Sequence, residues 1–287
     1  MLYLKSFHFQ KEEAEWHFFM EQRRTCYDTF YPYQIFPQRG LSRIDFEPVT
    51  ILYGGNGSGK TTALNIISEK LKLERDSLYN RSNFFEDYLQ GCVYELAPET
   101  WEIPAGSRVI TSDDVFDYIL NIRCLNEGIH EKREDLLAQY TEMKYSDFKF
   151  RSLDDYDKLK RVNLARSKTQ SKFIRGSLMD NVRERSNGES AFMYFVEKIR
   201  ENGLYLLDEP ENSLSPGRQM ELMEFIEDSA RFFGCQFIIS THSPFLLSMK
   251  GAKVYDLDQN PVCVQKWTEL ENVRTYYEFF KRHEEEF

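Results

Sequence analysis

The sequence predicts an α/β protein built on a mostly parallel central sheet. Three short apolar runs support this prediction: "VTILYG" (49–54), "LYLLDE" (204–209) and "QFIISTH" (236–242). Each run is apolar until a glycine or polar residue near its carboxyl end, as expected for buried parallel strands. A glycine-rich turn and helical periodicity over about 60–73 follow the first run. Strand, turn and helix in this order begin an α/β unit.

Two further segments complete the outline of the sheet. Residues 1–8 alternate between apolar and polar side chains, which predicts a strand at the N-terminus. "GSRVITSDDVF" predicts a strand over 108–111 that runs into a helix, with Ser112 and the two aspartates that follow as its caps.

Composition excludes several classes of protein. The 287 residues are 41% hydrophobic and carry a formal net charge of −10, which excludes a disordered chain and one that coats nucleic acid with its whole surface. No apolar run approaches the roughly 20 residues of a membrane span, so we expect a cytoplasmic protein without membrane insertion. The five cysteines are scattered and favour reduced thiols over a zinc site: Cys26, Cys92, Cys124, Cys235 and Cys263.

"GGNGSGKTT" between the first strand and its helix predicts a phosphate-binding loop. Its glycines allow successive backbone N–H groups to turn toward phosphates, and the helix that follows points its positive end at them. Lys60 is expected to reach the outer phosphates and Thr61 to bind magnesium. The predicted ATP-binding residues are Gly54, Gly55, Asn56, Gly57, Ser58, Gly59, Lys60, Thr61 and Thr62.

Two acids end the second apolar run. An unpaired carboxylate at the end of a buried strand is costly, and a magnesium ion offsets that cost. We therefore expect Asp208 to hold the cation and Glu209 to orient and deprotonate the water that attacks the γ-phosphate. The alternative is a pair of acids that caps the next helix.

His242 follows the third apolar run. Open α/β sheets place ligand-contacting residues just beyond the carboxyl ends of their strands. His242 shares such a position with Lys60 and Asp208, so we interpret it as a sensor of the γ-phosphate.

"SNGES" ahead of the apolar run 191–196 has two interpretations. A Ser followed three residues later by Glu is a capping box at a helix start. Its place between the phosphate-binding loop and "LYLLDEP" also makes it a candidate signature loop, in which the helix start presents N–H groups to a phosphate. The residues are Ser186, Asn187, Gly188, Glu189 and Ser190.

Basic residues outnumber acidic ones over 158–185. The excess predicts either a solvated or ATP-facing face, or a contact with a polyanion such as DNA.

These motifs together resemble the ATP-binding cassette (ABC) ATPases, and within them the soluble heads of chromosome-maintenance and DNA-repair ATPases. More closely, the chain is similar to small bacterial "AAA family" predicted ATPases, whose "GENGSGKST", "SHGES", "LYLLDEPEAALSP" and "FIIATHSP" are matched here by "GGNGSGKTT", "SNGES", "LYLLDEPENSLSP" and "FIISTHSP". The match runs from about residue 30 to the end and is loosest over 70–185.

The resemblance implies an ABC ATPase head as a single domain over 1–287. This fold adds an antiparallel N-terminal strand region and inserts a helical subdomain, here about 112–200, between the P-loop and the signature. It also implies a homodimer that closes on ATP and Mg²⁺, with the signature of one chain over the P-loop of the other, and that acts as a clamp or switch on DNA or a protein effector. Alternatives are a transporter motor and a nucleotide-gated binding module with little turnover.

Some positions depart from the family pattern. The glutamine that transporters carry between P-loop and signature is matched best by Asp113, as a metal candidate, with Asp114 and Gln90 as rivals. Ser215 replaces the usual aspartate after the Walker B segment, the run that ends at Asp208 and Glu209. Tyr33 and Phe36 are positional candidates for stacking on adenine, with the core as the alternative place for both.

Overall fold

The computed structural model describes residues 1–23, 26–147, 155–182 and 186–287. These residues form two compact units. The first combines Met1–Phe116 with Asn187–Phe287, and the second is Asp117–Ser186. The range of about 112–200 given to a helical subdomain is wider than the second unit, because α7 (Asn187–Lys198) belongs to the first.

A six-stranded sheet organises the first unit in the order β5-β6-β7-β3-β8-β9. The first five strands in this order are parallel and β9 is antiparallel to β8. The strands are β3 (Val49–Tyr53), β5 (Arg108–Thr111), β6 (Leu204–Asp208), β7 (Gln236–Ser240), β8 (Lys253–Asp256) and β9 (Cys263–Val264). The mostly parallel sheet expected from the apolar runs is confirmed.

The register of this sheet brings the functional ends of its strands together. Thr111 pairs with Asp208, and Asp208 with Ser240, while Ser240 also pairs with Leu52 of β3. Since these strands are parallel, the residues that follow each of them emerge at one edge. The P-loop, the Walker B acids and His242 are therefore neighbours in space.

An antiparallel sheet in the order β2-β1-β4 contains the N-terminal strand, as expected. Its strands are β1 (Leu4–His8), β2 (Arg43–Asp45) and β4 (Val93–Leu96). The buried side chain of Gln236 joins the two sheets: its Oε1 accepts the N–H of Tyr3 and of Leu4, each at 2.8 Å, and its Nε2 donates to Leu4 O at 2.8 Å.

Helices surround the sheets of the first unit. They are α1 (Glu12–Glu21), α2 (Lys60–Leu71), α3 (Phe85–Gly91), α7, α8 (Pro216–Phe232), α9 (Pro244–Leu247) and α10 (Glu271–Arg282). Short 3₁₀ turns lie at Pro37–Arg39, Trp267–Glu269 and Glu284–Glu286. The main hydrophobic core, which includes Ala63, Leu64, Ile66 and Ile67 of α2, is rich in aromatic rings.

α4 (Ser112–Tyr145) begins in the first unit and is 34 residues long, about 50 Å at 1.5 Å per residue. Its cap corrects the sequence-based prediction by one residue. Thr111, not Ser112, caps the helix through reciprocal hydrogen bonds with Asp114. Asp114 Oδ2 accepts Thr111 N at 2.7 Å, and Thr111 Oγ1 accepts Asp114 N at 3.3 Å.

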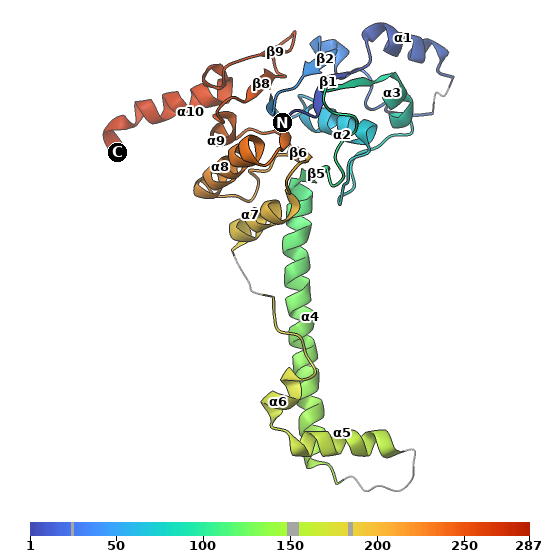
Figure 1. Cartoon of the computed structure of the whole chain (residues 1–287), viewed down its shortest axis with the longest axis vertical. Helices are drawn as coiled ribbons and strands as arrows, with labels where there is room; N and C mark the ends of the chain where they lie inside the picture. Colours follow the sequence, from blue (N-terminus) through green and yellow to red (C-terminus); the bar gives the residue numbers. More distant parts are fainter. Residues whose placement is uncertain (24–25, 148–154, 183–185) are drawn as a thin grey trace. The chain divides into compact units, whose positions relative to one another are not determined.

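α5 (Tyr156–Ser167) and α6 (Gln170–Arg175) complete the second unit, and Figure 1 shows them beside the far end of α4. Tyr140, Ala165 and Phe173 form its buried cluster. The described basic side chains of the run 158–185 are exposed: Lys158, Lys160, Arg161, Arg166, Lys168, Lys172 and Arg175. Arg183 and Arg185 lie outside the described residues.

Candidate functional site

The P-loop joins β3 to α2 and surrounds the Lys60 ammonium. Lys60 is 4% exposed, and its Nζ donates to Gly54 O at 2.7 Å and to Gly55 O at 3.2 Å. Burial lowers the pKa of Lys60, while the carboxylates of Glu209 and Asp208 oppose this effect. The loop therefore holds a buried cation that the acids at the end of β6 partly stabilise.

The geometry of this loop explains why two of its positions are glycines. Gly59 immediately precedes α2 at φ +97°, in the left-handed region, and a Cβ there would lie 3.0 Å from Ile35 Cγ2. A Cβ on Gly54 would lie 2.7 Å from Ser58 Oγ. Side chains at these positions would force the loop away from its compact curve.

Arg39 and Asp258 brace the P-loop, and the sequence analysis missed both. Asp258 Oδ2 accepts the N–H of Gly55 at 2.6 Å. Arg39 donates through Nη1 to Leu257 O at 2.7 Å and through Nη2 to Gly57 O at 3.2 Å. The loop is thereby tied to the chain that follows β8.

Asp208 and Thr61 offer a pair of oxygen ligands. Thr61 Oγ1 donates to Asp208 Oδ1 at 3.1 Å, and the Ser240 hydroxyl donates to the same oxygen. Burial raises the pKa of Asp208, and the two hydroxyl bonds lower it. The Thr61 hydroxyl and the Asp208 carboxylate are a pair of oxygen groups that fits Mg²⁺. This ion is usually bound by one or two protein oxygens together with substrate phosphates. No group of three or more His, Cys, Asp or Glu able to hold a metal occurs among the described residues.

Glu209 and His242 meet at the Lys60 ammonium. His242 Nε2 lies 2.8 Å from Lys60 Nζ, and Glu209 Oε1 lies 3.9 Å from that nitrogen and 3.6 Å from His242 Nε2. Burial, then the charge of Lys60, lowers the pKa of His242, which favours a neutral imidazole that accepts from Lys60. Glu209 adopts φ +48°, an uncommon conformation for a residue other than glycine, and Asn212 Nδ2 donates to its Oε2 at 3.1 Å.

A polar cavity of about 390 Å³ adjoins Thr61 and Asp208. Of the three metal candidates of the middle region, Asp113 lines this cavity. Asp114 instead accepts hydrogen bonds from Thr111, and Gln90 is exposed on α3.

Two further residues of this cavity were missed from the sequence, Tyr31 and Arg75. Tyr31 OH donates to Thr62 Oγ1 at 3.2 Å. Arg75 Nη2 donates to Asn65 Oδ1 at 2.6 Å, while its Nε and Nη1 are buried without a hydrogen-bond partner in the described part of the chain. Burial lowers the pKa of Arg75. The cavity is therefore lined by a tyrosine hydroxyl and by an arginine whose guanidinium is partly buried.

The positional candidates for adenine stacking lie in the core. Tyr33 is 6% exposed and stacks on Phe18, and Phe36 is fully buried and stacks on Phe9. Both rings belong to the aromatic core, which was the alternative place for them. Tyr31, two residues before Tyr33, lines the polar cavity instead, as does Tyr79.

The predicted signature stands at the start of α7, where Asn187 is the first helical residue. A Cβ on Gly188 would lie 3.4 Å from Ser213 O and 4.0 Å from Ser215 N, so the helix start packs on the loop before α8. Ser215 itself occupies the N-cap position of α8 without a side-chain capping bond. Among the described residues, the lining of the polar cavity includes none of the signature.

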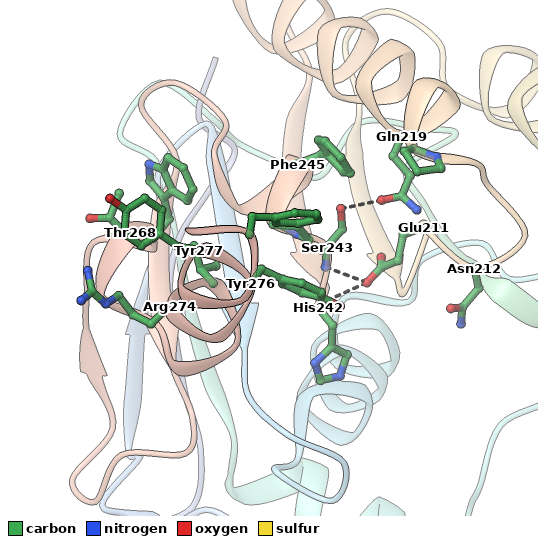
Figure 2. A pocket seen from close by; sticks show the side chains of 15 residues that line it. Glu211, Asn212, Gln219, His242, Ser243, Phe245, Thr268, Arg274, Tyr276 and Tyr277 are labelled. Carbon is green, nitrogen blue, oxygen red and sulfur yellow. Dashed lines mark hydrogen bonds between the residues drawn. The ribbon is translucent and has the colours of Figure 1, made fainter. Parts of the chain in front are cut away.

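A larger cavity of about 840 Å³ borders the site as well (Figure 2). His242 and Glu211 line it together with aromatic side chains of Phe245, Tyr276 and Phe280.

No helix among the described residues is long and apolar enough to cross a membrane.

The mostly parallel sheet thus carries a P-loop motif, the two Walker B acids and a strand-end histidine at one edge, which is the arrangement of a nucleotide-binding site. The family model described as "AAA domain, putative AbiEii toxin, Type IV TA system" matches residues 113–248, just under half of the chain. The matched range includes the signature, Asp208, Glu209 and His242, whereas the P-loop lies before it.

Solved structures are similar at low identity. The Smc head domain with an extended coiled coil from Pyrococcus furiosus, bound to the C-terminal domain of ScpA, shares 14% identity over 98% of this chain and 100% of that one, with a TM-score of 0.45. The Smc head domain from Thermotoga maritima shares 13% over 92% and 98%, with a TM-score of 0.38. A "putative metal-chelate type ABC transporter" shares 14% over 83% and 82%, also with a TM-score of 0.38. Among curated proteins, no sequence matches this chain.

Proposed function

We propose that this protein binds and hydrolyses ATP with Mg²⁺. The observation that carries the proposal is the meeting of Lys60, Glu209 and His242 at the carboxyl edge of the parallel sheet, beside Thr61 and Asp208. Three different strand ends contribute to this cluster, so chance proximity along the sequence does not account for it.

Each residue has a role that follows from its chemistry. Lys60 moves from the P-loop carbonyls to the outer phosphates, whose charge replaces the partial charges it now contacts. Thr61 and Asp208 hold Mg²⁺, which neutralises charge on the phosphates when it is bound. Glu209 accepts the proton of the attacking water, and His242 contacts the γ-phosphate. Asp113 lines the adjoining cavity and is a further candidate for the cation.

Turnover experiments test this proposal. Lys60→Ala should remove ATP binding or hydrolysis, and Glu209→Gln should keep binding and lose hydrolysis, because the amide cannot accept the proton. Lys70→Ala is the matched control on the same helix, since Lys70 Nζ donates to Leu89 O outside the P-loop. Phosphate release measured with Mg-ATP reports the result. Full activity in Lys60→Ala would refute the proposal.

We further propose that two copies close on ATP, with Ser186, Asn187, Gly188 and Glu189 of one copy over the P-loop of the other. The start of α7 supplies N–H groups and a positive helix end to the γ-phosphate. Hydrolysis then opens the dimer, which makes the protein a clamp or switch. Such a signature needs no contact with its own P-loop.

The exposed basic side chains of α5 and α6 favour a DNA partner for this clamp. Phosphate contacts by Lys and Arg weaken steeply with salt, so DNA binding should fall as salt rises. Charge reversal at Lys168, Lys172 and Arg175 should abolish it, whereas reversal at Lys11 and Lys266, exposed elsewhere on the chain, should not. Salt-independent binding, or equal binding by both variants, would exclude this face and leave a protein effector.

A further inference from the structure

Glu211 lies two residues after the proposed catalytic acid, Glu209. Its carboxylate binds the backbone of the loop that carries His242. Its Oε1 accepts the backbone N–H of His242 at 2.6 Å and that of Ser243 at 3.2 Å (Figure 2). Its Oε2 is buried and has no hydrogen-bond partner among the described residues. Burial raises the pKa of Glu211, and the His242 N–H bond lowers it. A partly desolvated carboxylate thus lies here and accepts two backbone hydrogen bonds.

The backbone of His242 needs this support because the sheet no longer provides it. β7 ends at Ser240, and the bond from Thr241 N to Leu52 O, at 3.4 Å, is the last one to a neighbouring strand in the described part of the chain. Beyond it, Glu211 accepts the His242 N–H, and Asn272 Nδ2 at the start of α10 donates to His242 O at 2.8 Å. Both backbone groups of His242 are therefore fixed by side chains from other elements.

We propose that Glu211 is a positioning residue that holds the His242 amide so that the imidazole stays against Lys60 and Glu209. The inference deepens the proposed function and rests on it, since it assigns a means of holding the residue that contacts the γ-phosphate. Glu209 and Glu211 belong to one short loop, so this loop carries the general base and also fixes the sensor. A displacement of the loop moves both groups together.

Activity measurements form the first part of the test. Glu211→Ala should lower kcat for ATP by roughly 10- to 100-fold with KM changed less than about threefold, since a misplacement of about 1 Å costs up to this factor. Glu211→Gln should recover part of the loss, because its carbonyl still accepts but without charge assistance. Glu227→Ala is the matched control: Glu227 Oε1 accepts Lys250 N at 2.8 Å, a bond that involves none of the proposed ATP-site residues, and its loss should leave kcat unchanged.

A double substitution separates positioning from a general structural effect. If Glu211 acts through His242, Glu211→Ala should add little in a His242→Ala background, because coupled residues are not additive. A full additional loss in that background would overturn the proposal.

Amide spectra test the bond without any turnover. The protein has five histidines, so ¹⁵N-histidine labelling gives five backbone peaks at most, and His242→Ala identifies the relevant one. The short bond to a carboxylate predicts a downfield His242 amide proton that moves upfield in Glu211→Ala and stays in place in Glu227→Ala. An unmoved peak would overturn the inference. A wild type that binds ATP without hydrolysing it would contradict the proposed function instead, while this peak still decides whether Glu211 holds His242.

Discussion

Glu15 on α1 gives a prediction whose size can be worked out from the structure. Its side chain is buried, with the residue 3% exposed, and Oε2 accepts Gln34 N at 2.7 Å while Oε1 is buried without a hydrogen-bond partner in the described residues. Burial raises the pKa of Glu15 from 4.5 to about 7, against the lowering effect of the Gln34 bond. The folded protein therefore holds this proton more tightly than the unfolded chain does.

The sign of the effect on stability follows from this difference. Stability contributed by the protonated carboxyl is present below pH 4.5 and is lost as the pH rises through about 7. At 1.4 kcal/mol per pH unit, the full loss is about 3 kcal/mol. Glu15→Gln keeps an acceptor for Gln34 N and cannot ionise, so it escapes this loss. We expect the variant to match the wild type near pH 4.5 and to be more stable by about 3 kcal/mol at pH 8.

Urea unfolding followed by tryptophan fluorescence at several pH values measures the difference. Glu13→Gln, exposed on the same helix, is the control and should track the wild type throughout. Comparing variants at each pH cancels the contribution of other titrating groups. A stability difference that does not change with pH would refute the reasoning.

Three shorter predictions concern the sheets, the site and the loop. Gln236→Leu should destabilise the protein by about 3 kcal/mol or more in urea unfolding, because it leaves the backbone groups of Tyr3 and Leu4 without partners, whereas Gln90→Leu on the surface should cost little. ATP turnover should be constant above neutral pH and should decrease at pH values below 6.5, the ordinary histidine pKa, since the pKa of His242 is lowered and its protonation would place an imidazolium against the Lys60 ammonium. A pH profile of unchanged shape in His242→Gln would contradict this. Asp258→Ala should weaken ATP binding several-fold in titrations with a fluorescent analogue because the N–H of Gly55 loses its brace, and equal binding would show that the loop needs none.

The sequence predicted the residues at strand ends well for a physical reason. A polar residue that ends a buried apolar run is visible without knowledge of the fold, and parallel strands place such ends at one edge. Asp208 and His242 are of this kind, whereas Lys60 was found from the glycine-rich loop between a strand and a helix, and the structure brings all three together. Their roles in turnover stay predictions.

Residues that depend on strand order or on packing could not be found this way. Asp258 reaches the P-loop because β8 pairs with β3, which no local pattern reveals. Arg75 is an ordinary basic residue in the sequence, and only burial of its guanidinium makes it a candidate ligand contact. Tyr33 and Phe36 were placed near the nucleotide by position alone, and the aromatic partners that bury them come from α1 and β1 with its flanking chain.

The length of α4 was also hidden from the sequence. Its 34 residues have weak amphipathic character because much of the helix is polar on all sides, and such a helix lacks the periodic apolar stripe by which long helices are recognised. The N-terminal end was found from its cap, but the range beyond it was not.

The mass of the Glu209→Gln variant in solution tests the central claim most directly. One chain has a mass of 34.2 kDa. Sedimentation of Glu209→Gln with Mg-ATP should give about twice this mass. The same variant without nucleotide or with Mg-ADP should give the mass of one chain, and so should the Lys60→Ala, Glu209→Gln double variant with Mg-ATP. A Glu209→Gln variant that binds ATP and stays at 34.2 kDa would contradict the ATP-closed dimer.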